Sequence, residues 1–96
     1  MVGAAPDDRY VVIGGRRWRA TDPQIPEEDA KRLRYALMDA RRAVRAALRA
    51  DDGDALRDAR RRVQAAKVAL GERGVPWWEQ SLDERRARWS APLDDG

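Results

Sequence analysis

Cysteine, histidine and phenylalanine are all missing from this chain of 96 residues. Without cysteine the chain can form no disulfide, no thiolate nucleophile and no cysteine metal site. Without histidine it lacks the commonest general base and the commonest zinc ligand. We therefore expect a protein that is not an enzyme, with no catalytic residues, no metal site, no cofactor and no small-molecule substrate.

Long apolar runs are also missing. No stretch approaches the roughly 20 apolar residues of a membrane-spanning helix, and MVGAAPDDRY has no basic flank before an apolar run, as a secretory signal has. We expect a cytoplasmic protein with no membrane contact. Aromatic residues are few (4 Trp and 2 Tyr) and much of the apolar content is alanine, so the core of so short a chain is thin and self-association is expected.

Lysine is scarce, and arginine supplies nearly all of the positive charge. Only Lys31 and Lys67 are lysines among 20 basic residues, which oppose 17 acidic ones for a net charge of +3. Guanidinium groups bind phosphates and carboxylates in bidentate fashion, so the composition is compatible with either ligand. GC-rich codons produce the same composition, and only the placement of the arginines can favour a function.

The segment RYVVIGGRRWRA, residues 9–20, predicts a β-hairpin, because Gly14 and Gly15 supply the positive φ angles of a two-residue turn. The turn pairs Tyr10 with Arg19, Val11 with Trp18, Val12 with Arg17 and Ile13 with Arg16. One face then carries Val11, Ile13, Trp18 and Ala20, and we expect it to join the core. The opposite face is basic and partly aromatic and carries Tyr10, Val12, Arg17 and Arg19.

Two amphipathic helices follow, over residues 26–50 and 54–71. Apolar residues recur in alternating steps of three and four in both, which is a heptad pattern. In the first helix these residues are Ala30, Leu33, Leu37, Ala40, Val44 and Ala47. In the second they are Leu56, Ala59, Val63, Ala66 and Leu70. The turn DDGD, residues 51–54, breaks the pattern with a glycine and supplies an acidic cap, which predicts an antiparallel helical hairpin.

The last third of the chain predicts a helix end, a tryptophan pair and a short helix. Gly71 or Gly74 can take the left-handed conformation that ends a helix. Trp77 and Trp78 point in opposite directions if the chain is extended there, so we expect Trp77 in the core and Trp78 at least partly exposed. SLDE, residues 81–84, predicts a capping box for a helix that ends near residue 90.

These elements predict an α+β fold that is mostly α, in which an N-terminal β-hairpin packs on an antiparallel helical hairpin plus a short C-terminal helix. We expect a single small domain over residues 9–90, with flexible tails at 1–8 and 91–96.

Three sequence blocks together carry a resemblance: RYVVIGGRRWRATDP, ARRAVRAA and AKVALGERGVPWW. They resemble a family of short uncharacterised bacterial proteins, some of which carry a label tied to Tol biopolymer transport. The resemblance covers roughly residues 9–79. It implies no established activity and supplies no catalytic residues.

Other motifs favour structural roles. Most acidic residues lie in helix caps or three to four residues from an arginine, where they form helix-surface pairs. DDGD begins like a calcium loop, but no glutamate closes it at the required distance. The Gly14–Gly15 pair could suggest a phosphate cradle, but no helix begins behind it.

Two functions remain. The first is a non-catalytic protein-interaction or regulatory module that associates with itself or with an unidentified protein partner, because several apolar side chains fall outside the heptad patterns. The candidate partner-binding residues are Trp77, Trp78, Tyr35, Met38 and Leu48. The alternative is a nucleic-acid-binding accessory protein that uses the arginine-rich hairpin face. The candidate nucleic-acid-binding residues are Tyr10, Arg16, Arg17, Arg19, Arg41, Arg45 and Arg49.

Overall fold

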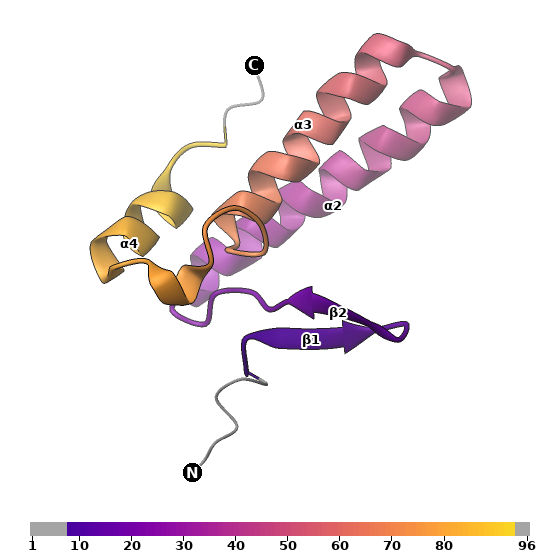
Figure 1. Cartoon of the computed structure of the whole chain (residues 1–96). Coiled ribbons are helices and arrows are strands. Elements are labelled where there is room, and N and C mark those ends of the chain that lie inside the picture. Colours follow the sequence, from indigo (N-terminus) through magenta and orange to yellow (C-terminus); the bar gives the residue numbers. More distant parts are fainter. Residues whose placement is uncertain (1–7, 94–96) are drawn as a thin grey trace.

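A computed structural model describes residues 8–93 of the chain (Figure 1). The element order is β1 (Tyr10–Ile13), β2 (Arg16–Arg19), α2 (Glu27–Ala50), α3 (Gly53–Ala69), the short 3-10 helix η1 (Trp77–Glu79) and α4 (Leu82–Ser90). The predicted fold class is confirmed: a two-stranded antiparallel hairpin, a pair of packed helices and a short C-terminal helix.

Helices α2 and α3 pack along the predicted heptad residues. Leu33 and Ala40 on α2 and Ala66 on α3 are fully buried, while Val44 and Val63 are half-buried. The break between the helices differs from the prediction, because the left-handed residue is Asp51 (φ 53°) and Gly53 is the first residue of α3. Aspartate tolerates this conformation, and Asp52 caps α3 by accepting a hydrogen bond from the Ala55 N–H at 3.0 Å.

The core lies at one end of the helical hairpin. It contains Ile25, Leu33, Leu37, Leu70 and Trp89, together with small alanines from both helices. The loops at residues 20–26 and 70–81 and helix α4 cover this end, whereas the opposite end of α2 and α3 projects away from the rest of the described chain (Figure 1). Alanine at the contact lets the two helices approach closely at that projecting end, but it buries little area.

A buried carboxylate joins α4 to the rest of the core. Asp22 is 2 % exposed, and its side chain accepts hydrogen bonds from the guanidinium groups of both Arg85 and Arg88. The Asp22 backbone N–H donates to the Leu70 carbonyl at 2.9 Å. Gly71 (φ 82°) lies against this junction, and a Cβ there would come within 3.1 Å of the Asp22 Cβ. The sequence pattern does not predict this junction, because its carboxylate and its two arginines lie more than 60 residues apart.

The hairpin has the predicted register, with Val11 opposite Trp18 and Ile13 opposite Arg16. The prediction that one face joins the core is wrong, because Val11 is 42 % exposed and Ile13 is 65 % exposed. The hairpin is attached mainly at its base, where the Arg19 guanidinium donates to the Gly74 carbonyl at 2.8 Å and the Tyr10 ring lies 5.6 Å from the Trp78 ring. The strands extend beyond this base (Figure 1), so neither face of the hairpin is buried by the rest of the fold.

The tryptophan pair divides as predicted, although its backbone is a 3-10 turn and not extended. Trp77 is 8 % exposed, and its indole N–H donates to the Ala20 carbonyl at 3.0 Å. Trp78 is half-buried, and its ring lies edge-on to Trp77 at 5.1 Å and to Tyr10 at 5.6 Å. Trp77 therefore belongs to the core, and Trp78 holds the base of the hairpin.

The predicted tails fall mostly on residues 1–7 and 94–96, which lie outside the described residues. At Leu93 the predicted C-terminal tail is wrong, because this side chain packs against the core cluster. Within residues 8–93 none of the helices combines the length and the apolar character that crossing a membrane requires.

Candidate functional site

A hollow of about 540 Å³ separates the β-hairpin from the helices. Its hairpin wall carries Val11, Ile13 and Trp18, the residues expected in the core. The opposite wall is cationic and carries Arg41 from α2, Lys67 from α3 and Arg73 from the loop that follows α3. The remaining lining residues are Arg19, Ala20, Thr21 and Glu72.

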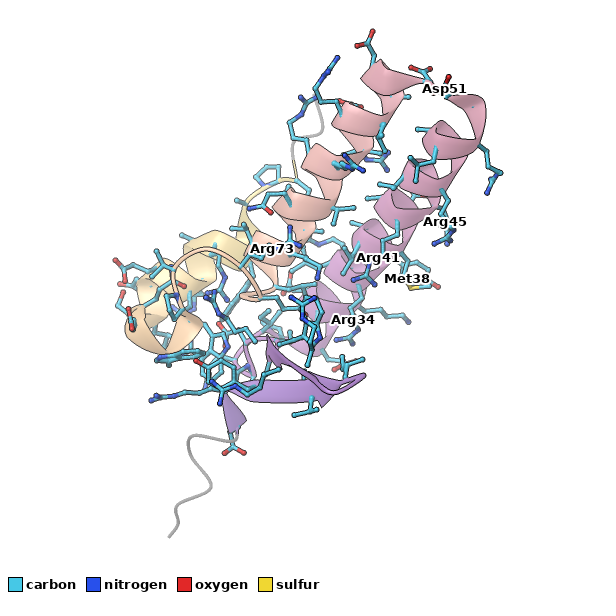
Figure 2. The ribbon with its side chains drawn as sticks, turned by 45° about the vertical axis from the view of Figure 1, so that its right-hand side comes forward. Arg34, Met38, Arg41, Arg45, Asp51 and Arg73 are labelled. Atoms are coloured by element: carbon cyan, nitrogen blue, oxygen red, sulfur yellow. The ribbon has the colours of Figure 1, made fainter. Side chains whose placement is uncertain are left out.

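A second hollow of about 460 Å³ continues from the first along the helices. It shares Arg41 and Arg73 with the first hollow and adds Arg45, Arg60 and the apolar pair Val44 and Val63. Figure 2 shows Arg34, Met38, Arg41 and Arg45 following one side of α2, with Arg73 beside them. We call the two hollows together, with the lining residues named above, the basic groove.

Salt bridges divide the basic side chains of the molecule into two groups. Arginines of the first group each have a carboxylate partner: Arg32, Arg34, Arg42, Arg57, Arg61, Arg62, Arg85, Arg86 and Arg88. Within residues 8–93, the bases without such a partner are Arg9, Arg16, Arg17, Arg19, Lys31, Arg41, Arg45, Arg49, Arg60, Lys67 and Arg73. All of the unpaired bases except Lys31 and Arg49 lie in or next to the hairpin or line the basic groove.

Lys67 lies partly buried in the lining of the basic groove, near both cations and a carboxylate. Burial lowers the pKa of its ammonium group below the usual 10.5, and the charges of Arg73 and Arg41 lower it further. Glu72 acts in the opposite direction but does not outweigh them, and its carboxylate also accepts a hydrogen bond from the Thr21 hydroxyl at 2.7 Å. A bound anion would raise the pKa of Lys67 again, because a nearby opposite charge favours the charged form of the ammonium group.

The hairpin bases interact mainly with aromatic rings. The Arg16 guanidinium carbon lies 4.6 Å from the centroid of the Trp18 ring, and that of Arg17 lies 4.3 Å from the centroid of Tyr10. Arg19 lies over Trp78 at 5.8 Å in addition to its hydrogen bond to Gly74. The predicted nucleic-acid face of the hairpin is therefore partly occupied, because Tyr10 and Arg19 attach the hairpin to the base of the fold.

The other predicted site residues lie on α2 and in η1. Arg41 and Arg45 line the basic groove, and Arg49 lies one turn beyond Arg45 on the same helix. Among the partner-binding candidates, Tyr35, Met38 and Leu48 are 63 %, 51 % and 55 % exposed. Trp77 is buried, so it offers no surface to a partner, and Trp78 is covered in part by Tyr10 and Arg9.

Sequence reasoning did not select Trp18, Arg60, Lys67 or Arg73 as site residues. The alternation of the hairpin predicts Trp18 in the core, and the segment around Arg73 predicts only a helix end at Gly71 or Gly74. Arg60 and Lys67 are seven residues apart, so they share a face of α3, and this spacing is the signal that could have identified them.

No protein-family model, curated protein or solved structure matches this chain. Within the part of the chain that the structure describes, no three carboxylate side chains are placed to hold a metal ion.

Proposed function

We propose that this protein binds nucleic acid through the basic groove and acts as a non-catalytic, cytoplasmic accessory protein. The observation that carries the proposal is the division of the basic side chains: those on other faces are largely neutralised by carboxylates, whereas those around the groove have no such partner in residues 8–93. Unpaired bases along a groove attract a phosphate backbone and release its condensed counterions.

The shape of the groove favours a polymer with regularly spaced charge. Arg41 and Arg73 belong to both hollows, so the cationic lining continues from the first hollow into the second. A single carboxylate on a protein partner would meet only part of this lining. The phosphates of a nucleic acid strand recur along the backbone and can meet it over its whole length.

Fluorescence anisotropy with labelled single-stranded DNA, duplex DNA and a structured RNA tests the proposal. Each is titrated at about 50 mM and about 200 mM salt, the range in which phosphate contacts change affinity most visibly. We expect binding at the lower salt and a steep loss at the higher salt. The absence of binding to all three at the lower salt would refute the proposal.

Arg41 and Arg42 provide a matched pair of variants. Arg41 lines both hollows, whereas the Arg42 guanidinium binds the Asp39 carboxylate at 3.2 Å. Arg41→Ala and Arg42→Ala remove the same charge from adjacent positions of one helix, and alanine preserves helix propensity. We expect only Arg41→Ala to weaken binding. Equal weakening by both variants would assign the affinity to net charge and not to the groove.

The second candidate function is a self-associating interaction module, which the exposure of Tyr35, Met38 and Leu48 on α2 favours. Sedimentation velocity without nucleic acid tests it. A dimer that dissociates in Leu48→Gln, at a position 55 % exposed in the single chain, would support this function. A monomer at all accessible concentrations would exclude self-association.

A further inference from the structure

We propose, on the basis of the nucleic-acid-binding function above, that the basic groove takes an unpaired nucleotide of a single strand. The base would lie against Trp18, Val11 and Ile13, and the phosphates would lie along Arg41, Lys67 and Arg73. The juxtaposition that carries the proposal is an apolar, aromatic wall that faces a cationic wall across one hollow. A nucleotide has the same division, with an apolar π-face at one end and a charged phosphate at the other.

Trp18 differs from the other tryptophans of the chain. Trp77 and Trp89 are buried in the core, and Trp78 packs against two aromatic rings. Trp18 is 37 % exposed, and in residues 8–93 its ring contacts no other aromatic ring. Its side chain therefore contributes no aromatic contact to the core and lines the groove instead.

The groups around the Trp18 ring are cations on flexible side chains. The Arg16 guanidinium carbon lies 4.6 Å from the ring centroid, and the Lys67 ammonium nitrogen lies 5.5 Å from it. A base that stacks on the ring can displace the exposed Arg16 side chain at little cost, since exposed cation–π contacts are worth roughly 0.5–1 kcal/mol. The half-buried Lys67 would exchange its contact with the ring for a contact with the phosphate. The displaced cations then lie next to the ring, where the phosphate of the same nucleotide needs them.

The concave shape selects a single strand over a duplex. In a duplex the bases are stacked inside and the outer surface presents phosphates, so no base can enter a hollow between the hairpin and the helices. Proteins that bind single strands combine a positively charged groove with aromatic side chains on which bases stack. The second hollow, with Arg45 and Arg60, extends the cationic lining beyond one nucleotide and so favours a strand over a free nucleotide.

The test compares three ligands: a labelled oligothymidylate of about 12 nucleotides, a length within the range that small single-strand-binding domains occupy, its duplex with oligodeoxyadenylate, and thymidine monophosphate as a competitor. We expect the single strand to bind more tightly than the duplex. We expect thymidine monophosphate to compete only at far higher concentration, because it cannot occupy both hollows.

Variants of Trp18 identify the stacking contact. Trp18→Ala should weaken binding of the single strand by roughly 5- to 150-fold and leave binding of the duplex nearly unchanged. Trp18→Phe keeps an aromatic face and should retain most of the affinity. Val12→Ala is the control, because Val12 is 69 % exposed on the other face of the hairpin. Circular dichroism establishes that each variant is folded.

The outcomes separate this proposal from the function on which it rests. The single-strand proposal is overturned if strand and duplex bind with equal affinity and neither Trp18→Ala nor Trp18→Phe changes that affinity. In that case, a loss of affinity for both oligonucleotides in Arg41→Ala would still support nucleic-acid binding. If thymidine monophosphate competes at concentrations as low as those at which the strand binds, the ligand is a free nucleotide, and the proposal of a strand is wrong. No binding of any oligonucleotide at low salt would overturn both proposals.

Discussion

Arg60 and Arg61 are consecutive residues of α3 with different electrostatic surroundings. The Arg61 guanidinium forms a salt bridge with Asp58, three residues earlier in the same helix. The Arg60 side chain lines the second hollow with Arg41 and Arg45 and has no carboxylate partner within residues 8–93. One residue of sequence thus separates a neutralised arginine from one that is free to bind an anion.

Arg60→Ala should lower the salt dependence of nucleic-acid binding. If Arg60 contacts one phosphate, the slope of log affinity against log salt should fall by about 0.7 for a single strand. Anisotropy titrations at several salt concentrations measure the slope. Arg61→Ala is the matched control and should leave the slope unchanged. A change of equal size in both variants would contradict the assignment of Arg60 to the groove.

Nucleic-acid binding should raise the pKa of Lys67, because a phosphate opposes the burial and the neighbouring cations that lower it in the free protein. Binding should then take up a proton at pH values between the lowered pKa and the usual 10.5, and affinity should fall as the pH rises through the lowered pKa. NMR titration of the labelled Lys67 ammonium group, with and without oligothymidylate, measures both pKa values. Lys31, an exposed lysine of α2, is the internal control. If the pKa of Lys67 is the same with and without oligothymidylate, the phosphate does not bind next to Lys67.

Asp22→Asn should destabilise the fold by about 3–5 kcal/mol, because it leaves Arg85 and Arg88 partly buried without their carboxylate. Urea denaturation measures the loss. Asp83→Asn is the control, because the Asp83 side chain is 96 % exposed and lies 3.8 Å from Arg86. A small, equal effect of both variants would mean that the Asp22 junction contributes little.

Acid should remove the contribution of Asp22. Burial alone would raise the pKa of this carboxyl group, but hydrogen bonds from Arg85, Arg88 and the Gln24 N–H outweigh burial and hold the pKa below 3.8. The stabilisation is present above the unfolded-state pKa of about 3.9 and is lost as the pH falls through the lowered folded-state pKa. Urea denaturation between pH 7 and pH 2 should therefore show a loss of stability in the wild type that is smaller in Asp22→Asn.

The two adjacent tryptophans should differ in their effect on stability. Trp77→Ala should cost about 3–5 kcal/mol, as removal of a buried aromatic side chain does. Trp78→Ala should cost about 1 kcal/mol, because Trp78 is half-buried and its main contacts are aromatic edges. Thermal unfolding of the two variants measures the difference. Equal destabilisation would mean that Trp78 is as much a core residue as Trp77.

The features that the sequence predicted correctly depend on residues close together along the chain. The Gly14–Gly15 turn determines the hairpin register, since both glycines have positive φ angles. The capping box of α4 joins Ser81 and Glu84 by two hydrogen bonds, at 2.8 and 3.1 Å. The heptad spacing of α2 and α3 determines which sides of the two helices meet. In each case the interacting groups lie within one or two turns of the chain or repeat along one helix. The spacing of residues in the sequence is therefore sufficient to predict the local structure.

The candidate site was predictable only in part, from the single side of α2 that carries Arg41 and Arg45. The rest depends on segments that only the tertiary structure brings together: Trp18 on the hairpin, Lys67 on α3 and Arg73 in the loop after it. Their arrangement follows from long-range contacts, such as the hydrogen bond from Arg19 to Gly74 and the one from Trp77 to Ala20.

Local patterns in the sequence thus predict the hairpin register, the two long helices and the cap of α4. The tertiary structure alone decided that the apolar face of the hairpin lines a groove and that Asp22 binds Arg85 and Arg88, which lie 63 and 66 residues away. The physical reason is that turns, caps and heptads are short-range interactions. The path of the loops that carry the hairpin and α4 onto the helices depends instead on buried contacts between residues far apart in the chain.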